Sequence, residues 1–267
     1  MVTHGVFSTG HPYYRFGNGD TPLLVLPGVT AGIGWWNDPD WLTATALERY
    51  YFRAYRDYDV WVMPRPPGGE RTTTAAMAAD YAEVLEALGT ANVIGISLGS
   101  AIGAHLTAET DLVERLVLIS CGTGLGAFGR QTVTRWQEFA AAGRYRELHL
   151  DYIRRVYAGR NRLLIPPLYR LGAPWLPKPT CEGDVGRACE AMLSYDGTIL
   201  SDVSVPSLVV GGKEDSLVPI TAHRDAAARL DCSLALAPGG HAVYEESRRD
   251  VASAINPFLR GDPLTQR

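Results

Sequence analysis

The chain has 267 residues, of which 46% are hydrophobic, and a formal net charge of −4 at neutral pH. This length and apolar content suffice for a sizeable core, and they fit one α/β domain that carries a large insertion. The acidic balance, without any basic block in the sequence, argues against nucleic acid and anionic membranes as partners.

Strand and helix patterns alternate along most of the chain. Residues 13–16 predict an antiparallel edge strand, because the turn sequence GNGD follows them at once. Apolar runs then predict buried strands at residues 23–27, 60–64, 92–97, 116–120 and 207–212, with a weaker strand at 233–238. Helical spacing predicts helices at residues 72–89, 98–110, 220–230 and 245–260. This alternation is typical of an α/β fold with a doubly wound, mostly parallel sheet.

The alternation stops between residues 122 and 200, where no convincing strand pattern occurs. Amphipathic helical patterns cover residues 132–143, 145–159 and 182–197, and a proline-rich apolar stretch lies at 163–179. A segment of roughly 80 residues is too long to be a bare loop in a compact domain. We therefore expect a core made of residues 1–121 and 201–267, with residues 122–200 inserted as a helical cap.

The N-terminal residues show no basic stretch followed by an apolar run, so the sequence predicts no secretory signal. No stretch approaches the roughly 18 uninterrupted apolar residues of a membrane span, and we expect a cytoplasmic protein. The four cysteines lack the CxxC spacing of a zinc site, which predicts no metal. Cys181 and Cys189 are close enough in sequence to pair, although unpaired thiols are usual inside cells.

The sequence GISLG at residues 95–99 places Ser97 between two glycines, after a strand pattern and before a helix pattern. Glycine destabilises strands and helices, so Gly95 and Gly99 predict a turn too sharp for side chains, and Gly103 predicts close packing of the helix on the sheet. A helix that starts beside Ser97 presents free N–H groups to a developing oxyanion. The alternative is a purely structural one, in which a tight turn merely tolerates small residues.

A nucleophilic serine needs a base and a group that orients the base, and two later loops supply candidates. The strand at 207–212 leads into GGKEDSLVP, which contains Asp215, and the strand at 233–238 leads into GGH, which ends at His241. Glu214, on the same loop, is the rival acid. The other five histidines have no partner that the sequence can place.

Taken together, these motifs resemble those of the α/β-hydrolase fold superfamily over the whole chain. The resemblance implies that Ser97 is the nucleophile, His241 the general base and later acid, and Asp215 the residue that orients the imidazole. It also implies an oxyanion hole made by the backbone N–H groups of Val29, in LPGVTAG, and Leu98. It implies no cofactor. The sequence departs from common members at Pro27-Gly28 and at MPRPPGGE, residues 63–70.

The expected activity is hydrolysis of a carboxylic ester, or a related acyl bond, of a small to medium hydrophobic substrate. The same triad also serves C–C bond hydrolases, lyases and cofactor-free perhydrolases, and a capped ligand sensor is the alternative outside enzymes. The candidate substrate-binding residues are Trp35, Trp36, Trp136 and Trp175. Phe139, Tyr157 and Leu164 are expected to form mostly the interior of the cap, with some of its apolar residues facing the cleft.

Overall fold

The computed structural model describes residues 2–32, 39–172, 179 and 181–262, which include an eight-stranded sheet in the order β1-β2-β4-β3-β5-β6-β7-β8. Neighbouring strands are parallel from β4 to β8, whereas β2 pairs antiparallel with both β1 and β4. The strands are β1 (Thr3–Val6), β2 (Pro12–Phe16), β3 (Pro22–Leu26), β4 (Asp59–Val62), β5 (Ala91–Ile96), β6 (Val113–Ile119), β7 (Ser207–Gly212) and β8 (Ser233–Ala237).

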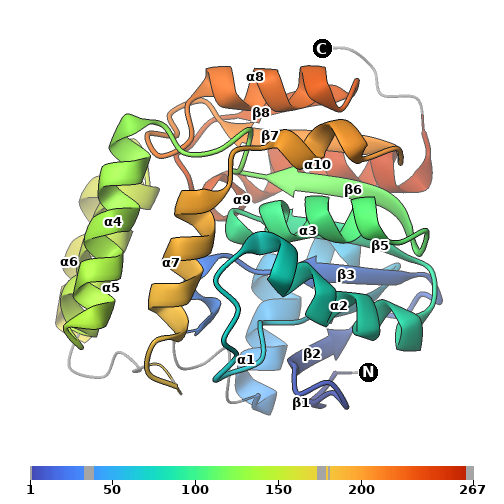
Figure 1. Cartoon of the computed structure of the whole chain (residues 1–267), viewed down its shortest axis with the longest axis horizontal. Helices are drawn as coiled ribbons and strands as arrows, with labels where there is room; N and C mark the ends of the chain where they lie inside the picture. Colours follow the sequence, from blue (N-terminus) through green and yellow to red (C-terminus); the bar gives the residue numbers. More distant parts are fainter. Residues whose placement is uncertain (1, 33–38, 173–178, 180, 263–267) are drawn as a thin grey trace.

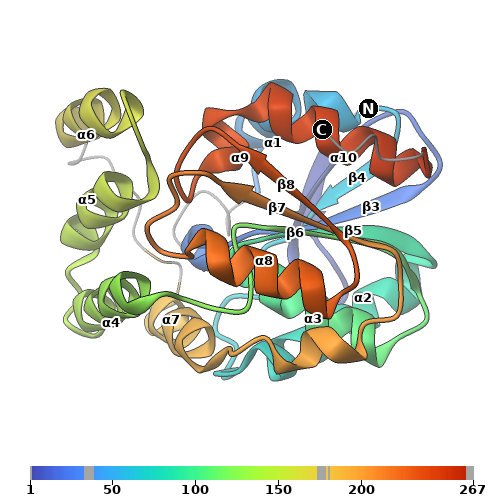
Figure 2. The ribbon, with the colours of Figure 1, turned by 90° about the horizontal axis from the view of Figure 1, so that it is seen from above.

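Helices cover both faces of the sheet, which explains why the central strands are mostly apolar (Figure 2). Every residue of β5 and β7 is buried. One face packs against α2 (Thr74–Leu88), α3 (Leu98–Glu109) and α8 (Ile220–Arg229). The other face packs against α1 (Trp41–Ala46), the π-helical turn η3 (Leu47–Tyr51), η4 (Arg53–Tyr55) and α10 (Arg248–Arg260). The predicted fold class, a doubly wound and mostly parallel α/β sheet, is confirmed.

Two local predictions were wrong. The strand β2 is antiparallel as expected, but it is not the edge strand, because β1 pairs along its outer side. The sequence of β1, THGV, contains one apolar residue and so lacks a strand pattern. The predicted helix at 245–260 is two helices, α9 (Val243–Glu246) and α10, which are separated at Ser247 by non-helical backbone.

Residues 122–200, called the helical segment below, connect β6 to β7. The described part of this segment lies beyond the carboxyl ends of the parallel strands (Figure 1). The helices here are α4 (Ala127–Ala141), α5 (Tyr145–Val156), α6 (Asn161–Gly172), α7 (Asp184–Ser194) and the start of η6 (Thr198–Asp202). The sequence analysis assigned no helix at α6, because the chain there contains Pro166 and Pro167.

All four cysteines are free, which answers the open question of whether Cys181 and Cys189 pair. Cys189 is fully buried in α7, whereas the Cys181 sulfur lies near Gly68 in the loop after β4. Within the described ranges, no helix is long and apolar enough to span a bilayer.

Candidate active site

Ser97 lies in the turn between β5 and α3, in a backbone conformation that L-residues rarely adopt, with φ 53° and ψ −117°. The turn is this sharp because two glycines leave no side chain in its way. A Cβ on Gly95 would lie 2.3 Å from the Ser100 Cα, and a Cβ on Gly99 would lie 1.9 Å from the Leu26 carbonyl oxygen. The backbone of this turn therefore presents the Ser97 side chain at the carboxyl edge of the sheet.

A chain of hydrogen bonds joins the three side chains that the motifs singled out. His241 Nε2 is 2.9 Å from Ser97 Oγ, and His241 Nδ1 is 2.9 Å from Asp215 Oδ2. The three residues follow β5, β7 and β8, whose carboxyl ends meet at one edge of the sheet. The fold thus places a hydroxyl, an imidazole and a carboxylate in the order that nucleophilic catalysis requires.

Asp215 is buried and its carboxylate is fully engaged. Its Oδ1 accepts hydrogen bonds from the backbone N–H groups of Leu217 at 2.9 Å and Val218 at 3.0 Å. Burial alone would raise the pKa of Asp215, but the charge of His241 and hydrogen bonds to the carboxylate outweigh it and hold the pKa well below its usual value. The rival acid, Glu214, is exposed on the same loop, with its backbone N–H bonded to the Gly239 carbonyl.

His223, which the sequence analysis left without a partner, lies behind Asp215. Its side chain is fully buried on α8, and its Nε2 is 3.9 Å from Asp215 Oδ2. Neither ring nitrogen has a hydrogen-bond partner among the described residues. The ring packs against Gly211, where a Cβ would lie 2.6 Å from His223 Cδ2. Asp215 therefore has an imidazole on each side, one bonded and one in close contact.

The loop after β3 passes directly beside Ser97. A Cβ on Gly28 would lie 3.9 Å from Ser97 Oγ, and the next residue, Val29, begins the short helix η1 (Val29–Gly32). Leu98 begins α3 in the same way. Helix geometry leaves such first N–H groups without an intrahelical acceptor, so both could donate to an oxyanion. The assignment of Val29 and Leu98 to an oxyanion hole stays a prediction.

Arg65 fixes this loop, and the sequence analysis missed it. Its guanidinium donates to the carbonyl of Gly28 at 3.1 Å and to the carbonyl of Val29 at 3.1 Å. Burial lowers the pKa of Arg65. The residue belongs to the MPRPPGGE stretch, and an arginine between two prolines was the only signal in the sequence.

A cavity of about 710 Å³ opens onto Ser97 and His241. The helical segment forms part of its wall through Trp136, Tyr157 and other residues. Trp136 is 2% exposed, and its indole N–H donates to Asp151 at 3.0 Å, so this tryptophan both lines the cavity and packs inside the segment. Leu164 is 62% exposed and lies elsewhere. Trp35, Trp36 and Trp175 fall outside the described residues. Among those described, no group of three or more potential ligands could hold a metal ion.

The chain was compared with known proteins. A model of the alpha/beta hydrolase family matches residues 23–254. RutD of Azorhizobium caulinodans, inferred to be a carbamate hydrolase, is 29% identical over 217 residues, which cover 78% of each chain. An α/β hydrolase enzyme from a Medee basin deep-sea metagenome library has a TM-score of 0.78 at 17% identity, covering 99% of this chain and 100% of that one.

The enol-lactonase from Burkholderia xenovorans has a TM-score of 0.76 at 17% identity, over 97% of this chain and 100% of that one. At these identities the solved structures show a shared fold, whereas the family model covers most of the chain. The chain therefore belongs to the alpha/beta hydrolase family, as its motifs suggested.

Proposed function

We propose that the chain is a serine hydrolase that cleaves a carboxylic ester, or a related acyl bond, of a small to medium hydrophobic substrate. The hydrogen-bonded series Ser97–His241–Asp215 at the edge of a largely apolar cavity carries this proposal. A serine hydroxyl becomes a nucleophile when an imidazole in hydrogen-bond reach can take its proton and a buried carboxylate orients that imidazole.

The reaction proceeds through an acyl-enzyme. Ser97 Oγ attacks the substrate carbonyl while His241 Nε2 takes the hydroxyl proton, and Asp215 stabilises the imidazolium that forms. The N–H groups of Val29 and Leu98 hold the oxyanion of the tetrahedral intermediate. The intermediate collapses, and His241 gives its proton to the departing alcohol. Water then attacks the acyl-enzyme by the same route, with His241 as base, and releases the acid and Ser97.

The helical segment serves as the cap that selects the substrate. It contributes Trp136, Tyr157 and other residues to the cavity, while the core contributes the reacting groups. A cavity of about 710 Å³ falls within the range of small-molecule sites.

Carbamate hydrolysis is a second candidate, favoured by the resemblance to RutD. The same serine would form a carbamoyl-enzyme in place of an acyl-enzyme, without any change of residues or roles. An ester and a carbamate with the same alcohol, such as p-nitrophenyl acetate and p-nitrophenyl N-methylcarbamate, distinguish the two candidates by their kcat/KM.

Labelling and turnover together test the proposal. A fluorophosphonate probe should label wild-type protein on Ser97, as mapped by mass spectrometry, and should leave Ser97→Ala unlabelled. Wild-type protein should hydrolyse p-nitrophenyl esters over many turnovers. An adduct on another residue, or none on folded protein, would contradict the assignment of the nucleophile. A single slow burst without further turnover would favour the ligand sensor.

A further inference from the structure

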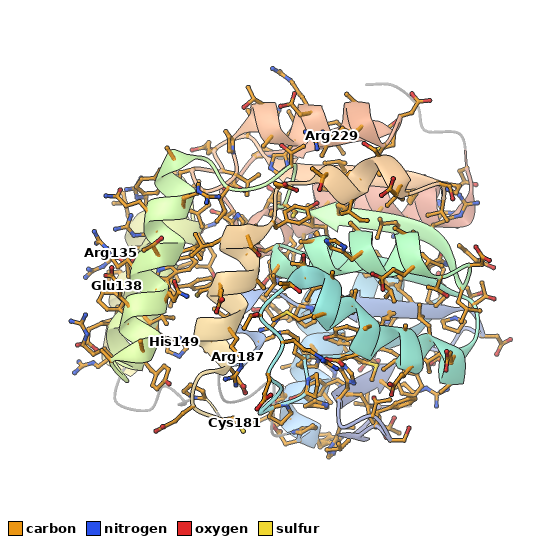
Figure 3. All side chains as sticks on the ribbon, in the orientation of Figure 1. Arg135, Glu138, His149, Cys181, Arg187 and Arg229 are labelled. Carbon is orange, nitrogen blue, oxygen red and sulfur yellow. The ribbon has the colours of Figure 1, made fainter. Side chains whose placement is uncertain are left out.

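The cavity is lined by negatively charged side chains besides the Ser97–His241–Asp215 series. Two carboxylates, Glu245 and Asp40, line it, and no lysine or arginine does so among the described residues. The labelled arginines of the helical segment lie elsewhere: Arg135 is on the outer side of α4, and Arg187 pairs with Asp184 on α7 (Figure 3). A cavity with this charge disfavours anionic substrates and favours cationic ones.

Glu245 is held in a fixed position in the wall. It lies on α9, four residues after His241, and both of its oxygens accept hydrogen bonds from tyrosines. Tyr157 from the helical segment donates to Oε2 at 2.5 Å, and Tyr244 donates to Oε1 at 2.8 Å. A carboxylate has about four acceptor positions, so each oxygen keeps one for a ligand.

The surroundings of Glu245 leave its charge incompletely balanced. Burial raises the pKa of Glu245, while the hydrogen bonds from Tyr157 and Tyr244 and the charge of Arg248 lower it, and Glu246 raises it further. Arg248 does not line the cavity, but it contacts the lining residue Tyr50: its guanidinium lies 3.6 Å from the centre of the Tyr50 ring and donates to the Tyr50 carbonyl. A cation in the cavity would therefore stabilise the ionised form of the Glu245 carboxylate, which burial disfavours.

Aromatic rings line the same cavity. Tyr51 and Tyr244 pack with ring centres 6.2 Å apart, and Trp136 packs on Tyr152 at 5.3 Å. The faces of such rings attract ammonium groups, including quaternary ones that cannot donate a hydrogen bond. A carboxylate surrounded by aromatic rings is thus an arrangement that binds organic cations.

We propose that Glu245 and these aromatic residues form a subsite for a cationic group, so that the preferred substrates are esters or carbamates that carry an ammonium group away from the scissile bond. The inference rests on the proposed function, since it names the substrate class of that same site. It distinguishes this chain from a hydrolase of purely hydrophobic esters.

Two esters of equal shape and different charge provide the test. Choline butyrate carries a trimethylammonium group, and 3,3-dimethylbutyl butyrate carries a neutral tert-butyl group in its place. The wild-type protein should hydrolyse the choline ester with a kcat/KM about tenfold higher or more. Glu245→Gln should remove most of this preference by slowing only the choline ester. Glu214→Gln, which alters an exposed carboxylate outside the cavity, should retain the preference.

The pH dependence of the kcat/KM ratio adds a second readout. Protonation of Glu245 as the pH falls should reduce the ratio in wild-type protein, and Glu245→Gln should lose most of this decline. Asp40 and His149 are further titratable groups of the cavity wall, and they are present in both proteins. Changes at His241 affect both esters and cancel in the ratio. The raised pKa of Glu245 places the decline at a higher pH than for an ordinary glutamate.

The outcomes separate the inference from the proposed function. Equal hydrolysis of both esters by wild-type protein, or an unchanged preference in folded Glu245→Gln, would overturn the cationic subsite while leaving the serine hydrolase intact. Failure of both esters together with failure to label Ser97 would instead overturn the proposed function. If Glu245→Gln does not fold, competitive inhibition of neutral-ester hydrolysis by tetramethylammonium replaces it. Inhibition supports the subsite, and its absence contradicts it.

Discussion

The loops after β5, β7 and β8 differ from the helical segment in how firmly their side chains are held. Asp215 accepts hydrogen bonds from two backbone N–H groups and lies against two imidazoles. In the helical segment, by contrast, large apolar residues such as Phe128, Leu163 and Leu164 are exposed. The proposed reacting groups lie where the sheet fixes their geometry, and the wall of the cavity comes partly from a region under weaker constraint.

One carboxylate helps to join the two regions. Glu246 accepts hydrogen bonds from the backbone N–H of Gly240 at 2.6 Å and from the backbone N–H of Ala158 at 3.0 Å. It also accepts one from the Asn161 side chain at 3.1 Å. The loop that carries His241 is therefore fastened to the junction of α5 and α6. We therefore expect substitutions in the sheet loops to change the rate of hydrolysis, and substitutions in the helical segment to change the preference among substrates.

The largest effect is expected at the orienting carboxylate. Asp215→Asn should lower kcat/KM for a p-nitrophenyl ester by about 10⁴-fold, because an amide favours the wrong tautomer of His241. The depressed pKa of Asp215 keeps the wild-type residue ionised as the pH falls through the usual assay range. Glu214→Gln is the matched control and should retain nearly full activity. A dead Glu214→Gln beside an active Asp215→Asn would reverse the assignment.

A smaller effect is expected at the residue that fixes the loop beside Ser97. Arg65→Met removes the donors to the Gly28 and Val29 carbonyls, so kcat should fall by about 10- to 100-fold, less than for loss of an oxyanion donor itself. KM for a small ester should change little. Arg71→Met, at an exposed arginine that pairs with Asp80, is the control. Equal kcat values for the two variants would show that the loop holds its place without Arg65.

Substitutions in the helical segment should change the preference among esters more than they change the rate for the smallest ester. Trp136→Phe opens space in the cavity and removes the hydrogen bond to Asp151, so kcat/KM for octanoate relative to acetate esters should shift by about three- to tenfold. Leu164→Ala, at an exposed position of the same segment, should keep the wild-type profile. Circular dichroism checks the fold of both. Identical profiles for all three proteins would mean that Trp136 does not select the acyl chain.

The core and its motifs were predictable because strong local patterns carry them. Buried parallel strands leave apolar runs, and the turn at Ser97 requires glycines within a few residues. Arg65, His223 and Glu245 lacked such patterns, since their significance depends on partners far away in sequence. Tyr157 and Glu245, for example, are 88 positions apart.

Element boundaries also followed from local signals where caps were present. Thr73 caps the start of α2 by accepting a hydrogen bond from the Ala76 N–H, and Gly89 ends that helix, as its sequence predicted. The strand β1 and the helix α6 were missed for the opposite reason. One has a single apolar residue, and the other contains prolines that ordinarily argue against a helix interior.

The strained backbone at Ser97 has a consequence for how such a protein changes over generations. A non-glycine residue in this conformation destabilises the fold by about 1–3 kcal/mol, partly offset by the greater freedom of glycine in the unfolded chain. Ser97→Gly should therefore raise the free energy of unfolding by about 1 kcal/mol in urea titrations, whereas Ser97→Ala should not. Equal stabilities of the two variants would contradict this account. The residue that best suits the backbone at this position is therefore not the residue that the proposed reaction needs, so selection for turnover would be what keeps a serine there.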